Sequence, residues 1–304
     1  MPDLSAGLKK RIAILRERMH APAEPARAWM RRRWRSLTVL ALGCVGVVLF
    51  DCWLLTCGFS GCPFRGEIRA FRPGEGGRIL DQNDRFLGRI AIVRRVNVPL
   101  DAIPLHVRQA FLATEDRRFY EHNGLDWRGL FRATAANVRH MGVREGFSTI
   151  TMQVARNSFL VKERGGRTLR RKLIELRLTR LIEGELSKDQ ILELYLNLIY
   201  LGNGMNGVEA ASRDLFGKSV SKLTMSEGAM LAALPKGPSA YTPRDHPERA
   251  LKRRNLVLSL MAENGYISPG EAAQDEQLPL RIAEDEWRPD TGKEPLALDA
   301  IRAL

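Results

Sequence analysis

Cysteine is scarce in this chain and is confined to one short region. Four of the 304 residues are cysteines (Cys44, Cys52, Cys57 and Cys62), and none follows position 62. The sequence contains no CxxC pair and no Cys/His cluster, so it offers no zinc site of the usual spacing. Cys57 and Cys62 could pair in an oxidising compartment, one of them could carry a lipid, or both could simply be apolar residues.

Acidic residues are also few at the N-terminus. Residues 1–36 contain ten Lys and Arg against three Asp and Glu, so they carry +7 of the total net charge of +13. A basic tail of this kind binds nucleic acid or an anionic membrane surface. The segment that follows the tail decides between these two.

Residues 37–59 form a long apolar run, interrupted by Asp51 and by threonines. These 23 residues are enough for a helix to cross about 30 Å of hydrocarbon, whereas a secretory signal peptide has a shorter core and a small-residue cleavage site. The arginines before the run, with Trp29 and Trp34 as interfacial anchors, predict a single-pass protein whose N-terminus is cytoplasmic. Nucleic-acid binding is then unnecessary, and the part after residue 60 is expected outside the cytoplasm.

The rest of the chain is predicted to be mainly α-helical, with a small β-hairpin at its start. Residues 78–93 alternate around a polar turn, which indicates the hairpin, and helical periodicity follows Pro104. The predicted helices are 105–120, 127–140, 148–160, 168–186, 188–200, 206–215, 224–234 and 247–264. The predicted organisation is a basic tail (1–36), a transmembrane helix (37–59), a linker with the hairpin (60–100), a helical domain (101–268) and a linker-like tail (269–304).

A charged stretch from Thr114 to Asp126 is the strongest candidate for chemistry. Apolar residues before it recur at helical spacing, which places Glu115 and Asp116 at the end of a half-buried helix. Burial there can raise the pKa of a carboxylate and suit it to general acid or base work. A solvated, charged helix end is the alternative.

Two further polar clusters could hold an anionic group. Arg171 and Lys172 lie four and three residues before Glu175, on one face of a predicted helix, although a surface ion-pair ladder of low energetic value is the alternative. In the stretch 146–157, hydroxyl, amide and guanidinium groups fall on the first turns of a helix, a position that suits phosphate. Simple capping of that helix by Ser148 is the alternative.

These stretches, in this order, resemble the motifs of the peptidoglycan glycosyltransferases, the lipid II polymerases found as monofunctional transglycosylases and in class A penicillin-binding proteins. The matching segments are Glu115–Asp126, Gly146–Gln153, Arg171–Glu175 with Glu183, Lys188–Asn197, Tyr200–Gly204, Gly207–Ser212, Phe216–Lys218, Leu231–Pro235, Pro238–Pro243 and Arg253–Arg254. The resemblance covers residues 78–268. It departs from the family pattern at Phe147, Met152 and Thr179, where Gly, Gln and Ala are usual.

The resemblance implies a fold, a reaction and a set of site residues. The expected fold is a lysozyme-like helical lobe with a second, hydrophobic lobe against the membrane. The expected reaction joins a lipid-diphosphate-linked glycan to the 4-hydroxyl of lipid II, with inversion from α to β and release of undecaprenyl diphosphate. Glu115 matches the general base and Glu175 the second essential glutamate. The matching substrate-binding residues are Asp116, Phe119, His122, Ser148, Thr149, Gln153, Arg156, Asn157, Arg171, Lys172 and Glu183, and the cations among them suit the diphosphate.

The expected setting is the bacterial cytoplasmic membrane, with the catalytic domain on its outer side. The implied partners are lipid II, the lipid-linked glycan, the membrane and other wall-synthesis proteins, but no nucleic acid. A divalent cation, Mg²⁺ or Mn²⁺, is the cofactor that the resemblance leaves open.

Two other functions and one question of extent stay open at this point. A lysozyme-like wall hydrolase would need a general acid for a sugar leaving group, which the cation-rich stretches disfavour, and a non-catalytic scaffold would not need both glutamates. Many relatives carry a transpeptidase domain, but Ser219–Lys222 fits its first motif by spacing alone and no Lys-Thr-Gly follows. With 36 residues after position 268, the chain is expected to be a monofunctional polymerase or, as its linker-like tail favours, to stop at the linker of a bifunctional one.

Overall fold

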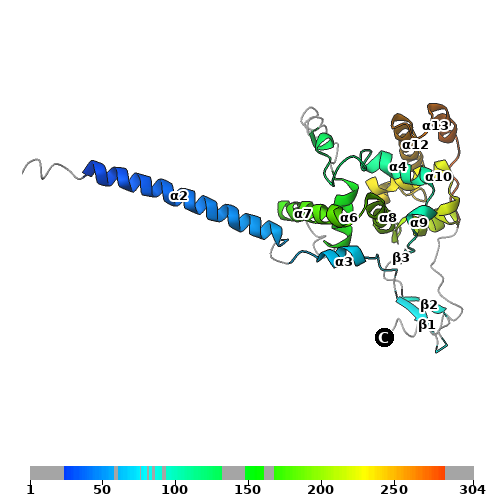
Figure 1. The fold of residues 1–304 in the computed structure, drawn as a ribbon. Helices are drawn as coiled ribbons and strands as arrows, with labels where there is room; N and C mark the ends of the chain where they lie inside the picture. The colour runs from blue at the N-terminus through cyan, green and yellow to red at the C-terminus, as the bar shows by residue number, and fades with distance from the viewer. Residues whose placement is uncertain are drawn as a thin grey trace, which may run out of the picture. The chain divides into compact units, whose positions relative to one another are not determined.

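The computed structural model describes residues 24–57, 61–75, 77–80, 82–83, 86–90, 94–131, 148–160 and 168–284 (Figure 1). The chain divides into two units, Met1–Ser60 and Gly61–Leu304. Phe147 and most of the basic tail lie outside the described residues, as do positions 132–140 of the predicted helix 127–140, which is helical at 127–131.

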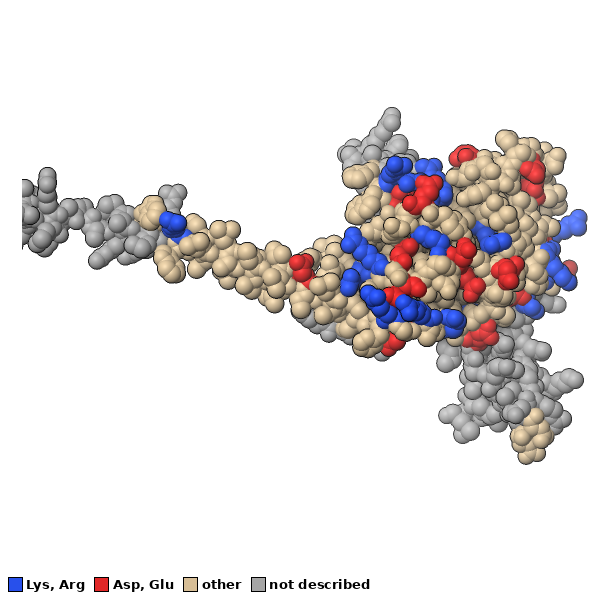
Figure 2. All heavy atoms as spheres, viewed as in Figure 1, with Lys and Arg blue, Asp and Glu red and all other residues tan. Residues whose placement is uncertain are grey.

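The described part of the first unit is one long helix, α2 (Glu24–Leu55). Its residues Ser36–Leu55 have a mean hydropathy of 2.2 and are exposed, which makes them a candidate membrane span. Figure 2 shows this stretch without Lys or Arg and with one acidic side chain near its end. The helix begins within the predicted tail because Pro25 suits a first helical turn, and it ends at Leu55 rather than at 59.

The cysteines fall into two classes. Cys57 and Cys62 are disulfide-bonded, whereas Cys44 and Cys52 are free. Of the three alternatives for Cys57 and Cys62, the structure therefore supports the disulfide. Such bonds form and persist in oxidising compartments.

The second unit is mainly helical, as predicted, with two short sheets. Its described elements are α3 (Arg65–Ala70), β1 (Gly77–Leu80), β2 (Phe86–Ile90), β3 (Arg94–Arg95), η1 (Leu100–Ala102), α4 (Leu105–Glu115), α6 (Ile150–Ser158), α7 (Leu169–Glu185), α8 (Lys188–Leu198), β4 (Tyr200–Gly202), β5 (Met205–Asn206), α9 (Val208–Phe216), η3 (Val220–Lys222), α10 (Met225–Ala233), η4 (Leu234–Lys236), α11 (Pro238–Tyr241), α12 (Pro247–Glu263) and α13 (Pro269–Glu276). The antiparallel pair β1–β2 confirms the predicted hairpin, with Gly77 opposite Ile90. The second sheet has the order β3-β5-β4, with β3 parallel to β5.

Two groups of helices form the core: α4, α10 and α12 pack together, and α6 packs against α7 and α8 (Figure 1). Helix α10 is buried from Gly228 to Ala233, as expected for a helix that is apolar on all sides. Phe111 of α4 meets Tyr195 of α8 edge to face, with 6.1 Å between the ring centroids. This contact joins the two groups of helices one turn before the end of α4.

Three stretches differ from the sequence-based expectation. Helix α4 ends at Glu115 rather than at 120, because Asp116 leaves the helical region with a φ of −159°. Residues 200–206 form β4 and β5 instead of a simple break. Helix α13 lies within the predicted linker-like tail, where Ser268 and Glu271 form a capping box at its start. The buried guanidinium of Arg254 donates to the carbonyls of Glu276 and Leu278 and thereby holds the end of α13 against α12.

Gly124 is a point of close packing between the turn after α4 and helix α7, and it can be tested by substitution. Its φ is +82°, and a Cβ there would lie 2.6 Å from Cγ2 of Thr179 and 2.9 Å from Cγ of Glu183. We expect Gly124→Ala to lower the free energy of unfolding by about 2–4 kcal/mol, because left-handed strain adds to overpacking. Denaturant unfolding in detergent measures the change.

The matched control is Gly184→Ala on α7, where nothing lies within 4 Å of an added Cβ. This variant should keep its stability or gain up to about 1 kcal/mol, since alanine favours a helix over glycine. Equal stability of the two variants would contradict the argument.

Candidate active site

A cleft of about 850 Å³ opens at the end of α4. Its walls come from five parts of the chain: the end of α4 with the residues that follow it, the segment 126–130, residues 148–156 around the start of α6, η4, and α12 with the residue after it. The predicted residues that line the cleft are Glu115, Asp116, Ser148, Thr149, Gln153 and Arg156. Residues separated by more than 100 positions therefore meet around one carboxylate, Glu115.

Glu115 is half-buried and is held by a single hydrogen bond. Gln153 Nε2 donates to Glu115 Oε2 at 2.7 Å, and within the described residues Oε1 has no such partner. Burial raises the pKa of Glu115, while the hydrogen bond from Gln153 and the positive charges of Arg253, Lys236 and Arg156 act to lower it. The balance leaves a carboxyl group with a raised pKa beside several cations, which suits proton transfer near neutral pH.

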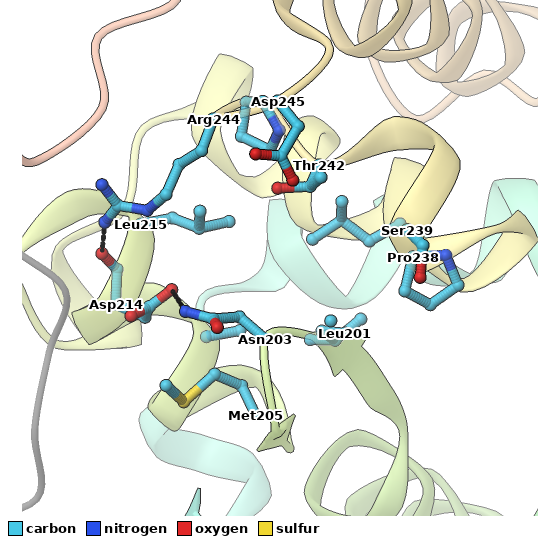
Figure 3. A pocket seen from close by; sticks show the side chains of 14 residues that line it. Leu201, Asn203, Met205, Asp214, Leu215, Pro238, Ser239, Thr242, Arg244 and Asp245 are labelled. Atoms are coloured by element: carbon cyan, nitrogen blue, oxygen red, sulfur yellow. Dashed lines mark hydrogen bonds between the residues drawn. The ribbon is translucent and has the colours of Figure 1, made fainter.

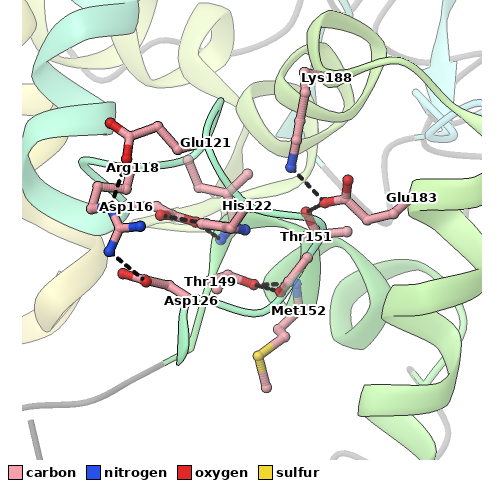
Figure 4. Close-up of polar contacts among 12 residues, drawn as sticks. Asp116, Arg118, Glu121, His122, Asp126, Thr149, Thr151, Met152, Glu183 and Lys188 are labelled. Atoms are coloured by element: carbon pink, nitrogen blue, oxygen red, sulfur yellow. Dashed lines mark hydrogen bonds and ion pairs between the residues drawn. The ribbon is translucent and has the colours of Figure 1, made fainter. Parts of the chain in front are cut away.

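Asp116 is buried, and its carboxylate points toward His122 and fixes the start of α6 (Figure 4). His122 Nε2 lies 2.9 Å and 3.1 Å from its two oxygens, and the backbone N–H of Ile150 donates to Oδ2 at 3.1 Å. Thr149 caps the helix by accepting from the N–H of Met152 and donates its own proton to the carbonyl of Gly124. Asp116, His122 and Thr149, predicted as substrate-binding residues, thus hold the turn and the helix together.

Glu183 and Phe119 also have structural contacts rather than a place in the cleft. Lys188 Nζ donates to Glu183 Oε1 at 2.8 Å, and the hydroxyl of Thr151 donates to the same oxygen (Figure 4). The Lys188 ammonium also lies 4.5 Å from the ring centroid of Phe119, which is buried. This cluster joins α6, α7 and α8 to the turn after α4. Glu183 and His122 line a separate groove on the other side of that turn.

The Lys172–Glu175 pair reaches the cleft through Ser148. Lys172 Nζ lies 3.1 Å from Glu175 Oε1 and 3.3 Å from Ser148 Oγ. Glu175 is buried, with 1% of its surface exposed. Burial lowers the pKa of Lys172, and Glu175 opposes that shift. Arg171 of α7 and Asn157 of α6 are half-exposed and lie outside the cleft lining.

The capping alternative for Ser148 is wrong, because Thr149 and not Ser148 caps the start of α6.

Lys236 and Arg253 are site residues to which the sequence pattern assigned no role. Both line the cleft, and both act electrostatically on Glu115. The sequence signal was present, because Arg253–Arg254 belongs to a matching motif. Only the helix geometry separates the two arginines: Arg254 is fully buried, while Arg253 faces the cleft.

The described His, Cys, Asp and Glu side chains do not gather into a metal centre. Among the described residues, no group of three or more His, Cys, Asp or Glu side chains could hold a metal ion.

A second, smaller cavity of about 170 Å³ lies between α9 and the segment after α11 (Figure 3). Arg244 donates to the backbone carbonyl of Asp214 at 2.7 Å, and Asn203 Nδ2 lies 3.4 Å from an Asp214 carboxylate oxygen. None of the predicted site residues lines this cavity. Its visible contacts hold α9 against the neighbouring segments.

The raised pKa of Glu115 predicts a pH-dependent cost in stability. Because the folded protein binds this proton more tightly than the unfolded chain, stability falls as pH rises from about 4.5 through the raised folded value. We expect Glu115→Gln to be more stable than the wild type at neutral pH, with a difference that shrinks toward pH 4.5. Thermal unfolding across this range measures it. Glu248→Gln, at an exposed position on α12, should not gain stability, and a pH-independent gain in Glu115→Gln would contradict the prediction.

Comparison with known proteins shows the family of the chain. The chain matches the Transglycosylase family over residues 83–262. It is 46% identical over 218 residues to penicillin-binding protein 1A of Aquifex aeolicus, covering 72% of this chain and 30% of that protein. It is 51% identical over 191 residues to penicillin-binding protein 1A of Escherichia coli, covering 63% and 22%.

A shorter relative and a solved structure extend the comparison. A Cupriavidus necator protein that is itself assigned as a transglycosylase is 48% identical over 185 residues, covering 61% of this chain and 78% of that protein. The crystal structure of penicillin-binding protein 1A from Haemophilus influenzae matches 74% of this chain and 23% of that chain at 26% identity, with a TM-score of 0.42. The chain thus spans less than a third of the penicillin-binding proteins compared, and it belongs to the transglycosylase family, the peptidoglycan glycosyltransferases.

Proposed function

We propose that this chain is a membrane-anchored peptidoglycan glycosyltransferase that polymerises lipid II into β-1,4-linked glycan. The observation that carries the proposal is the placement of Glu115. Its pKa is raised by burial, Gln153 fixes one oxygen, and three cations face the same cleft. A carboxylate in this setting suits the removal of a proton beside an anionic lipid diphosphate.

The chemistry follows from the two oxygens of Glu115. With Oε2 held by Gln153, Oε1 accepts the proton of the acceptor 4-hydroxyl as that oxygen attacks the anomeric carbon of the donor. The new carbon–oxygen bond forms as the bond to the diphosphate breaks, so the anomeric configuration inverts. Undecaprenyl diphosphate leaves as an anion and requires neutralisation rather than a proton. Arg156, which lines the cleft, and Lys172, which bonds to Ser148 at its edge, supply positive charge for that purpose, and Arg171 adds charge from the same helix as Lys172.

The proposed setting uses the candidate span of α2. Donor and acceptor are both anchored in the membrane by lipid tails, so an anchored enzyme shares their surface. We infer from the arginines before the span that the N-terminus is cytoplasmic and that the catalytic unit acts outside.

A lysozyme-like hydrolase is the second candidate, because a glutamate with a raised pKa also suits a general acid. The cations around Glu115 favour the polymerase, since a hydrolase leaving group is an uncharged sugar. The products distinguish the two: a hydrolase releases soluble muropeptides from finished wall, whereas a polymerase consumes lipid II.

Glu115→Gln should reduce polymerisation of lipid II by about 10²–10⁴-fold, because proton transfer by a positioned side chain contributes about that factor. The assay is glycan-chain formation from lipid II by the detergent-solubilised protein, with Glu248→Gln as the control that keeps wild-type activity. Undiminished chain formation by Glu115→Gln would overturn the assignment of the base. The same assay with a chelator tests whether a divalent cation, Mg²⁺ or Mn²⁺, is required, and inhibition by a moenomycin-type compound tests the family mechanism.

Glu175→Gln should move the pH dependence of lipid II binding. Burial lowers the pKa of Lys172 and Glu175 opposes that shift, so loss of the carboxylate lowers the pKa further. Lys172 would then lose its charge, and binding would weaken, at a lower pH than in the wild type. Binding titrations from neutral to alkaline pH measure the midpoint. Lys172→Met is the control and should remove this pH dependence; an unmoved midpoint in Glu175→Gln would refute the role given to Glu175.

A further inference from the structure

A groove of about 800 Å³ lies beside the catalytic cleft and takes no part in the proposed reaction. One wall is the segment from Arg118 to Arg128 after α4, and the other is the exposed side of α7 at Arg180 and Gly184. The buried ring of His122 forms the base of the groove. The volume is within the range of about 300–1,000 Å³ that is usual for ligand sites.

The groove and the cleft meet at Asp126, which lines both hollows. Arg118 donates to Asp126 Oδ1 at 3.0 Å and to Glu121 Oε2 at 2.8 Å (Figure 4). These charge-assisted bonds hold the border between the two hollows in place. A polymer bound in the cleft can therefore continue past Asp126 into the groove.

Trp127 supplies a large apolar surface to this groove. It lines the groove directly after Asp126, and 56% of its surface is exposed, although tryptophan is highly buried on average. The face of an indole ring carries partial negative charge, and the C–H groups on one face of a pyranose ring carry partial positive charge. An exposed indole in a groove is therefore a suitable platform for a sugar ring.

The polar groups of the groove suit a ligand that is rich in hydroxyls. Its acidic and basic residues are three arginines and three carboxylic acids, namely Arg118, Arg128, Arg180, Glu121, Asp126 and Glu183. The amide of Asn123 adds a donor and an acceptor. A sugar hydroxyl both donates and accepts a hydrogen bond, so it can use both kinds of group. Arg128 and Arg180 are exposed, and within the described residues neither forms an ion pair.

We propose that this groove binds sugar units of the glycan strand outside the reaction centre: Trp127 stacks on a pyranose ring, and Asn123 and Arg180 donate hydrogen bonds to its hydroxyl groups. The inference rests on the proposed function, because it takes the polymer of the cleft as the ligand. Continuity with the cleft at Asp126 favours this ligand. A strand held in the groove stays beside the cleft between successive additions, so the groove favours long products.

Binding of a short, soluble, peptide-free β-1,4-linked oligosaccharide of the wall sugars tests the site without lipid or turnover. Titrated into the detergent-solubilised full chain, it should bind Trp127→Ala about tenfold more weakly than the wild type, because an aromatic contact contributes about that factor. Trp127→Phe keeps a ring and should lose less. Arg180→Ala, on the opposite wall, should bind about threefold more weakly.

Phe131→Ala is the matched control for these variants. Phe131 is an exposed aromatic residue one helical turn after Trp127, and it lines neither the groove nor the cleft. Its substitution should leave the affinity for the oligosaccharide unchanged. Wild-type affinity in both Trp127→Ala and Arg180→Ala would overturn the sugar site. If Trp127→Ala lowers the melting temperature, Trp127→Phe and Arg180→Ala decide the question.

The length of the product separates failure of this inference from failure of the proposed function. Compared at equal consumption of lipid II, Trp127→Ala should release shorter glycan strands than the wild type or Phe131→Ala. Strands of unchanged length would overturn the role of the groove in holding the glycan. Oligosaccharide binding that depends on Trp127, in a chain that consumes no lipid II, would overturn only the proposed function.

A membrane anchor is the other use of an exposed tryptophan, and fluorescence distinguishes it from a sugar platform. Brominated phospholipids quench an indole that contacts their acyl chains. In nanodiscs that contain such lipids, the fluorescence that is lost on Trp127→Phe substitution should be unquenched. Quenching of this component would place Trp127 in the membrane and overturn the proposed sugar site.

Discussion

The site depends on one contact, between the end of α4 and the start of α6. Asp116 leaves the helical conformation and accepts a hydrogen bond from the N–H of Ile150, one of the donors that a helix leaves unpaired at its start. Its negative charge also matches the positive end of the helix dipole. Gln153 follows Ile150 by three residues and therefore lies on the same face of α6. The hydrogen bond between Asp116 and Ile150 therefore brings the neighbouring Glu115 within hydrogen-bonding distance of Gln153.

The same contact explains why charged residues of similar appearance have different roles. His122 through Nε2, Thr149 and Glu183 each form hydrogen bonds within the protein, and these bonds join α6, α7 and the turn after α4. Paired polar groups of this kind stabilise a buried junction. Glu115 differs because part of its carboxylate faces the cleft. A hydrogen-bonded junction thus holds a carboxylate that keeps one oxygen for the cleft, as is usual where function and stability compete.

Burial and positive charge act in opposition on Glu115. Burial disfavours its ionised form, while cations from α6, η4 and α12 favour it. Because these cations come from separate elements, the pKa of Glu115 depends on how all of those elements are placed around the cleft. The same cations would face an anionic substrate, so substrate binding and the basicity of Glu115 are physically linked.

The sequence by itself determined the features that depend on local pattern. Periodicity indicated the helices, the apolar run indicated a span, and the ordered motifs identified the family. Tertiary structure decided what depends on contacts between distant residues. The pairing of β3 with β5 joins Arg94 to Met205 through backbone bonds that no local pattern encodes. Likewise, packing of α13 against α12 buries Arg254. Adjacent side chains on a helix point about 100° apart, so Arg253 faces the cleft instead.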